Sequence, residues 1–117
     1  MKEDVKDLWL AALEGTKYRQ KTGELRGPIG NGKRMRNGYC CLGVLCDIAN
    51  KNKLVGLNGK PVVSDEKAEE LLGHSALLPT EVLKQVGLKP EQQDVLAGFN
   101  DSGASFKVIA TYIRGNL

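Results

Sequence analysis

The sequence is poor in aromatic residues and has no long apolar run. One Trp, three Tyr and two Phe occur among 117 residues, so we expect a core made mainly of aliphatic side chains. The longest stretch that is almost free of charge covers residues 39–50 and is broken only by Asp47. A membrane-spanning helix needs about 20 apolar residues, so this stretch predicts a buried segment and no membrane anchor.

Cysteine and histidine are also scarce. The three Cys are an odd number, and Cys40 and Cys41 are adjacent, a placement that rarely allows a disulfide. We therefore expect reduced thiols, as in a cytosolic protein. The single His74 and the cysteines lack the paired spacing of a zinc site, so neither a metal nor another cofactor is expected. The charged start of the chain, at Lys2 and Glu3, predicts no secretory signal.

The remaining composition is that of one globular domain over residues 1–117. Hydrophobic residues make up 41% of the chain and charged residues 26%, which is ordinary for a soluble domain with a single core. The length and the Ala and Leu content of residues 40–49 favour a buried helix. We therefore predict an α+β fold in which about five short helices surround a central helix at residues 40–49, with one or two small β-hairpins.

Apolar spacing and capping residues predict the surrounding helices. An apolar stripe at helical spacing runs through the first of them, at Val5, Leu8, Trp9, Ala12 and Leu13. Ser or Pro before the later helices, and Gly after them, fit helix starts and stops. The predicted helices cover residues 4–14, 65–72, 80–86 and 90–99, with a last helix between its cap Ser105 and Gly115.

Other segments are predicted to be extended or irregular. Residues 16–26 alternate basic and uncharged side chains, which indicates an edge strand. Residues 27–38 contain four Gly and one Pro, so we expect a loop. Asn58-Gly59 between two apolar runs predicts a hairpin of residues 54–57 and 60–63. Residues 100–103 predict a polar turn before the last helix.

Positive charge is concentrated between Lys17 and Arg36. Seven Lys or Arg and one Glu lie in this segment, whereas the whole chain carries a net charge of +3. Clustered positive charge attracts anionic partners without any requirement for base-specific contacts. The segment is therefore the strongest indication of a binding surface.

Two motifs in the sequence match known signatures only in part. Gly27 to Lys33 follows the Gly-x4-Gly-Lys pattern, but Arg34 stands where a P-loop needs Ser or Thr to hold magnesium. The last segment is similar to the first helix of a helix-turn-helix, but the sequence ends at Leu117 with no recognition helix after it. We therefore expect neither a nucleotide hydrolase nor sequence-specific nucleic-acid binding.

An enzymatic alternative rests on four residues. Gln20, Cys40, His74 and Asn100 (or Asp101) occur in the order oxyanion donor, nucleophile, base and orienting group, as in papain-like cysteine hydrolases. Cys40 lies at the predicted start of the central helix, where the helix N-terminus and a nearby imidazole would lower the thiol pKa. The alternative, purely structural interpretation is that the cysteines belong to the core and His74 to a solvated loop.

The chain resembles a family of small proteins encoded by bacteriophages and prophages. The resembling segments are Trp9-x-x-Ala12-Leu13, Tyr18-x-Gln20, the run from Cys40 to Asp47, and Asn100-Asp101-x-Gly103-x-Ser105-Phe106-x-x-Ile109-Ala110. The resemblance covers nearly the whole chain. It implies an accessory protein, such as an anti-defence protein, in the cytoplasm of the bacterial host. Small phage proteins of this kind often bind host proteins or host signalling molecules.

The leading functional prediction is therefore non-catalytic binding of an anionic partner. The partner is either a nucleotide-like signalling molecule or an acidic face of a host protein. Guanidinium groups match phosphate and carboxylate oxygens, and a tyrosine ring can stack on a base. A structural protein without ligand, and a homodimer, remain alternatives. The predicted ligand-binding residues are Tyr18, Arg19, Gln20, Lys33, Arg34, Arg36, Tyr39, Asn100 and Asp101.

Overall fold

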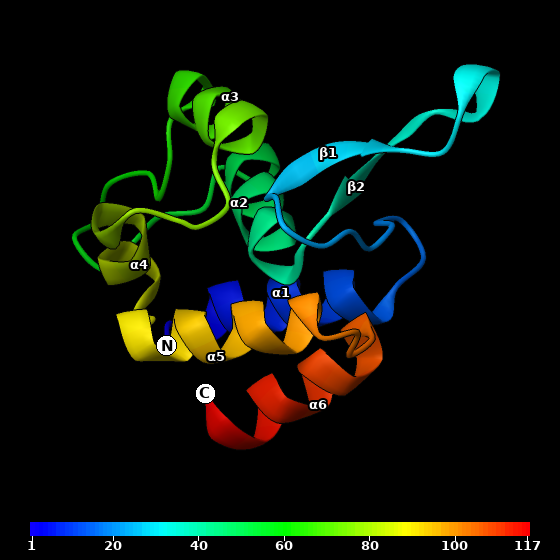
Figure 1. The fold of residues 1–117 in the computed structure, drawn as a ribbon. Helices are drawn as coiled ribbons and strands as arrows, with labels where there is room; N and C mark the ends of the chain where they lie inside the picture. The colour runs from blue at the N-terminus through cyan, green and yellow to red at the C-terminus, as the bar shows by residue number, and fades with distance from the viewer.

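The computed structural model describes all 117 residues and has an α+β fold. Five helices and a two-stranded antiparallel hairpin accompany the central helix α2, as predicted (Figure 1). No helix has the length and apolar content needed to span a bilayer. The elements are α1 (Glu3–Glu14), β1 (Arg26–Ile29), the short 3-10 helix η1 (Gly32–Arg34), β2 (Arg36–Tyr39), α2 (Cys41–Lys51), α3 (Asp65–His74), α4 (Thr80–Val86), α5 (Pro90–Asp101) and α6 (Phe106–Asn116).

Helix α2 is the centre of the core. Every residue from Cys41 to Ala49 is buried, which confirms the prediction of a central buried helix. Helices α1, α3 and α5 pack against α2, and α6 packs against α1 and α5. Helix α4 contributes three buried residues to the same core, Val82, Leu83 and Val86. The core is largely aliphatic, as the scarcity of aromatic residues predicted.

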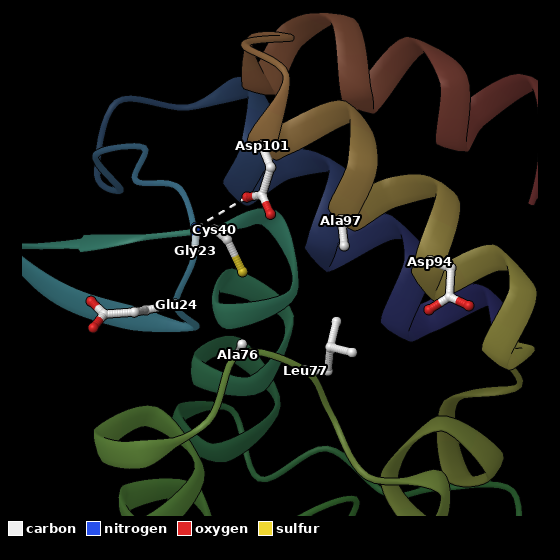
Figure 2. Close-up of a pocket in the computed structure, with 8 residues that line it drawn as sticks. All are labelled: Gly23, Glu24, Cys40, Ala76, Leu77, Asp94, Ala97 and Asp101. Atoms are coloured by element: carbon white, nitrogen blue, oxygen red, sulfur yellow. Dashed lines mark hydrogen bonds between the residues drawn. The ribbon is translucent and has the colours of Figure 1, made fainter.

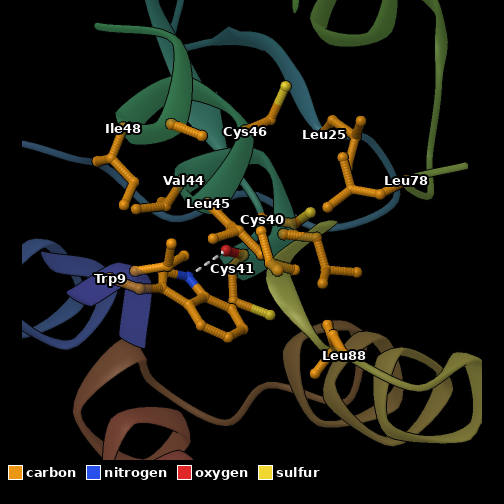
Figure 3. Packing of buried hydrophobic residues seen from close by; sticks show 14 of the residues in the cluster. Trp9, Leu25, Cys40, Cys41, Val44, Leu45, Cys46, Ile48, Leu78 and Leu88 are labelled. Atoms are coloured by element: carbon orange, nitrogen blue, oxygen red, sulfur yellow. Dashed lines mark hydrogen bonds between the residues drawn. The ribbon is translucent and has the colours of Figure 1, made fainter. Parts of the chain in front are cut away.

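Two close contacts fix the position of α2. The indole nitrogen of Trp9 donates a hydrogen bond to the carbonyl oxygen of Cys41 at 2.9 Å, so the largest core side chain also ties α1 to the start of α2 (Figure 3). The Leu25 carbonyl oxygen would lie 1.7 Å from a Cβ atom at position 43. Only glycine allows the chain at Leu25 to approach α2 this closely.

The predicted helix ends are largely confirmed. Ser64 and Ser105 cap α3 and α6, because each side-chain oxygen accepts a hydrogen bond from a backbone N–H in the first turn. Gly87 ends α4 in the left-handed conformation, with φ of 74°. Leu8 differs from the prediction of an inward-facing stripe on α1, since its side chain is 39% exposed.

The loop predicted for residues 27–38 is wrong, because this segment is most of a β-hairpin. Strands β1 and β2 pair in antiparallel register, with Ile29 opposite Arg36 and Arg26 opposite Tyr39. The edge strand predicted for residues 16–26 is reduced to one parallel bridge, between Gln20 and Tyr39. The glycines of this segment made the hairpin hard to predict. Gly38 nevertheless fits the hairpin, because a Cβ atom at position 38 would lie only 3.0 Å from the Ile29 side chain.

Two further local predictions need correction. Asn58-Gly59 forms a turn, with Gly59 at φ of 80°, but the flanking residues make only one bridge, Val55 to Pro61, and no strands. Pro61 has no N–H to extend the pairing. Residues 100 and 101, predicted in a polar turn, form the end of α5 instead. The side chain of Asn100 is fully buried there, where its amide forms hydrogen bonds with Gln20, Lys21 and Cys41 in two other segments.

Candidate functional site

The hairpin forms a projecting arm, defined here as residues 26–39. In Figure 1 the arm extends from the body of the molecule, with η1 at its outer end. All residues from Gly30 to Asn37 are exposed, including the apolar Met35 at 56%. The arm therefore presents Lys33, Arg34 and Arg36 to solvent at and beside its tip.

Most of the positive charge in this region has no acidic partner. Lys21 pairs with Glu24 at 3.6 Å and Arg26 pairs with Glu69 at 3.2 Å. No carboxylate lies within 4.0 Å of the other five basic groups in the segment. Those five are Lys17, Arg19, Lys33, Arg34 and Arg36. Four of them are the cations that the sequence analysis assigned to ligand binding.

The structure does not gather the predicted ligand-binding residues in one cavity. Arg19 and the three exposed basic residues of the arm, Lys33, Arg34 and Arg36, line none of the four pockets of the molecule, whereas Arg26 at the base of the arm lines one. Gln20 and Asn100 border one pocket, Asp101 a second and Tyr18 a third. The predicted set therefore divides into an exposed basic arm and several residues in the body.

Tyr18 belongs to the core and not to an open stacking platform. Its hydroxyl donates a hydrogen bond to the buried carboxylate of Asp47, which also accepts from the Lys51 ammonium at 2.9 Å. Burial, and then the hydrogen bond to Asp47, raise the pKa of the Tyr18 phenol. The ring of Tyr39 meets the ring of Tyr18 edge-on, with centroids 5.0 Å apart. The two tyrosines thus join the base of the arm to α2.

Gln20 and Asn100 form the hub of a hydrogen-bond network. The Gln20 amide nitrogen donates to Asn100 Oδ1 at 3.0 Å and to the Ala104 carbonyl at 2.7 Å, while its oxygen accepts from the Phe106 N–H. Asn100 Oδ1 also accepts from the Cys41 N–H, and its nitrogen donates to the Lys21 carbonyl. Both side chains are engaged in joining the segment at residues 20–21, α2, α5 and α6.

A pocket of about 300 Å³ lies beside Cys40 (Figure 2). Three carboxylates line it, and no Lys, Arg or His does, so it does not suit an anionic ligand. Asp101 Oδ1 accepts a hydrogen bond from the Gly23 N–H at 3.0 Å, which fixes the loop at one side of this pocket. The lining residues are Gly23, Glu24, Cys40, Ala76, Leu77, Asp94, Ala97 and Asp101.

The surroundings of Cys40 do not activate its thiol. Burial raises the thiol pKa, although the N–H of Gly43 donates to the sulfur at 3.4 Å and opposes this effect. His74 lies at the end of α3, lines a different pocket and makes no hydrogen bond to Cys40. Gln20 and Asn100 are held by the network described above. The structure also contains no group of three or more His, Cys, Asp or Glu side chains that could hold a metal ion.

Another of the four pockets, here called the lysine groove, lies between α1 and α2. It has a volume of about 350 Å³, and its lining contains two lysines and no carboxylate. Tyr18 was predicted to bind a ligand, but Leu8, Lys51 and Asn52 were not, because nothing in the order of the residues places the two helices side by side. The lining residues are Leu8, Ala11, Ala12, Gly15, Lys17, Tyr18, Ile48, Lys51 and Asn52.

Comparison with known proteins gives a family without an assigned activity. No curated protein and no solved structure matches the chain. A family model described as domain of unknown function (DUF8296) matches residues 1–95, which include the arm, α2 and Cys40. The chain belongs to this family.

Proposed function

We propose that the protein is a non-catalytic accessory protein of phage or prophage origin that binds an acidic face of a host protein in the bacterial cytoplasm. The arm supplies the contact surface. The single observation that carries this proposal is the set of basic groups on and beside the arm, Arg19, Lys33, Arg34 and Arg36, which are exposed and have no carboxylate partner. The phage resemblance of the sequence supports the origin and the location.

The shape of the arm favours a protein partner over a nucleotide-like molecule. Small-molecule sites are concave and bury most of their ligand, whereas Lys33, Arg34 and Arg36 line no pocket. A projecting ribbon can instead reach into or lie across a larger surface. Arg34 and Arg36 can form paired hydrogen bonds with carboxylates, and exposed Met35 adds apolar contact between them.

Charge reversal on the arm tests this proposal. The variant K33E/R34E/R36E reverses three unpaired charges without touching the core. We expect retention of a specific host protein by the immobilised wild-type protein and loss of at least tenfold in affinity in the variant, because like charges now face the acidic partner. Binding by the wild type falls as salt is raised from 50 to 300 mM, since screening weakens exposed ion pairs.

A matched control carries the same change in net charge elsewhere. K60E/K84E/K107E replaces three exposed lysines that form no ion pair, at positions outside the arm. This control retains the host protein as well as the wild type does. Equal retention of the host protein by the arm variant and the wild type would contradict the proposal. The proposal would also be contradicted if the wild type captured only nucleic acid and nuclease treatment abolished this capture.

The proposal also requires an unreactive Cys40. Because burial raises the pKa of this thiol, little thiolate is present at pH 7.5. We therefore expect iodoacetamide to alkylate Cys40 more slowly than it alkylates the thiol of free glutathione. Mass spectrometry of the native protein over time measures the rate, with the urea-unfolded protein as the control. Rapid alkylation of native Cys40 would favour the cysteine-hydrolase alternative.

A further inference from the structure

The lysine groove joins an apolar floor to two ammonium groups. Leu8 from α1 and Ile48 from α2 line it, and Ala11 and Gly15 leave room between them. Leu8 lies outside the buried stripe of α1 and is 39% exposed, so its side chain is accessible to a ligand. The groove is therefore apolar surface that no element of this chain covers.

The two lysines approach the same aromatic ring. The ammonium of Lys17 lies 5.8 Å from the centroid of the Tyr18 ring, and that of Lys51 lies 5.9 Å from it. Lys17 forms no ion pair, and its ammonium is free to bind an anion. The groove is thus bordered by positive charge, in contrast to the pocket beside Cys40 with its three carboxylates.

The buried Asp47 carboxylate fixes the position of the Lys51 ammonium. This carboxylate is almost fully buried, accepts from the Tyr18 hydroxyl and pairs with the Lys51 ammonium at 2.9 Å. The Lys51 side chain is nevertheless half exposed, and an ammonium has three N–H donors, so donors remain for a ligand. The hydrogen bond to Asp47 also raises the pKa of Lys51, which keeps this group charged.

We propose that the lysine groove is a binding site, separate from the arm, for a small carboxylate with an aryl or short alkyl body. The body lies between Leu8 and Ile48, and the carboxylate lies between Lys17 and Lys51. A volume of about 350 Å³ is at the small end of the range for ligand pockets, which suits a compact organic acid. Burial of the body and pairing of the charge both contribute, so neither feature alone gives full affinity.

A titration followed by two-dimensional amide NMR of the full chain tests both requirements. The probes are benzoate and hexanoate, with acetate as an anion without a body and benzyl alcohol as a body without charge. We expect saturable shifts at residues 8–18 and 48–52 with benzoate and hexanoate. Acetate and benzyl alcohol give weaker, non-saturating shifts over the same concentration range.

Variants separate binding from folding. Lys17→Gln removes a charge that forms no ion pair in the free protein, so the fold is retained, and we expect benzoate affinity to fall roughly fivefold. Lys60→Gln is the matched control, and its affinity equals that of the wild type. Ala11→Glu, an exposed position that lines the groove, adds bulk and negative charge and abolishes the shifts.

Several outcomes would overturn the assignment. They are shifts that never saturate, equal responses to acetate and benzoate, or an unchanged affinity in Lys17→Gln. The arm variant K33E/R34E/R36E binds benzoate as the wild type does, because the arm does not line the groove. Failure of host-protein binding and failure of carboxylate binding are therefore distinguishable.

Discussion

The arm and helix α2 are neighbours in the sequence but opposite in environment. Residues 30–37 are all exposed and carry three basic side chains, whereas residues 41–49 are all buried and carry a single charge. Only Gly38, Tyr39 and Cys40 separate the two segments. Tyr39 packs on Tyr18, and the N–H of Cys40 donates to the Leu25 carbonyl, so this short junction is itself fixed.

The contrast separates the part of the chain that makes the fold from the part that is free to bind. The buried helix receives contacts from three other helices, and almost any change of volume there affects the whole core. Residues 30–37 of the arm are all exposed, so substitutions there disturb no buried packing.

The largest effect is expected from a cavity in α2. Leu45→Ala removes a fully buried side chain and lowers the free energy of unfolding by about 2–5 kcal/mol. Met35→Ala on the arm, the control, changes it by less than about 0.5 kcal/mol. Urea denaturation followed by circular dichroism measures both. Similar losses in the two variants would show that the arm packs against the body.

A smaller loss is expected from one added methyl group on α2. Gly43→Ala brings a Cβ atom against the Leu25 carbonyl and lowers the free energy of unfolding by about 1–3 kcal/mol. Gly98→Ala, in α5, meets nothing within 4 Å and raises it by up to about 1 kcal/mol, because alanine favours a helix. The prediction fails if both changes stabilise the protein.

The smallest effect is expected from shortening the arm. Replacing residues 30–35 by Asn-Gly joins the paired residues Ile29 and Arg36 through a two-residue hairpin turn. The melting temperature stays within about 2 °C of the wild type, since no core contact is lost. The proposed host-protein binding is expected to be lost, because Lys33 and Arg34 are removed. A clear drop in melting temperature would contradict the independence of the arm.

Helices and their ends were the most predictable part of the fold. Their signals are local: an apolar stripe, a serine oxygen that accepts from the first turn, or a glycine at positive φ. Ser64, Ser105 and Gly87 all act as the sequence indicates. The central helix was predictable because a nearly uncharged stretch of this length favours the interior of a small domain.

The arm was not predictable because its strands lack an alternating apolar pattern. Neither face of the ribbon near its tip is buried, so no hydrophobic periodicity marks the strands. Pro28 and four glycines dominate the segment and suggest a loop. Pairing of Ile29 with Arg36 is visible only in three dimensions.

The candidate site was predictable only in its charge. The unpaired cations at Arg19, Lys33, Arg34 and Arg36 follow from their clustering in the sequence. Gln20 and Asn100, in contrast, were also assigned to binding, Asn100 because it was predicted to lie in a polar turn. Their role in the hydrogen-bond network depends on contacts between residues 59 to 86 positions apart, which a single sequence does not reveal.

The packing of α1 against α6 has a consequence for synthesis of the chain. The ribosome makes α1 long before α6, and until α6 emerges the apolar stripe of α1 lacks one of its two partner helices. The nascent chain therefore cannot complete its core one helix at a time. It must hold Trp9 and its neighbours unshielded, or in transient contacts, until residues 106–116 have left the exit tunnel.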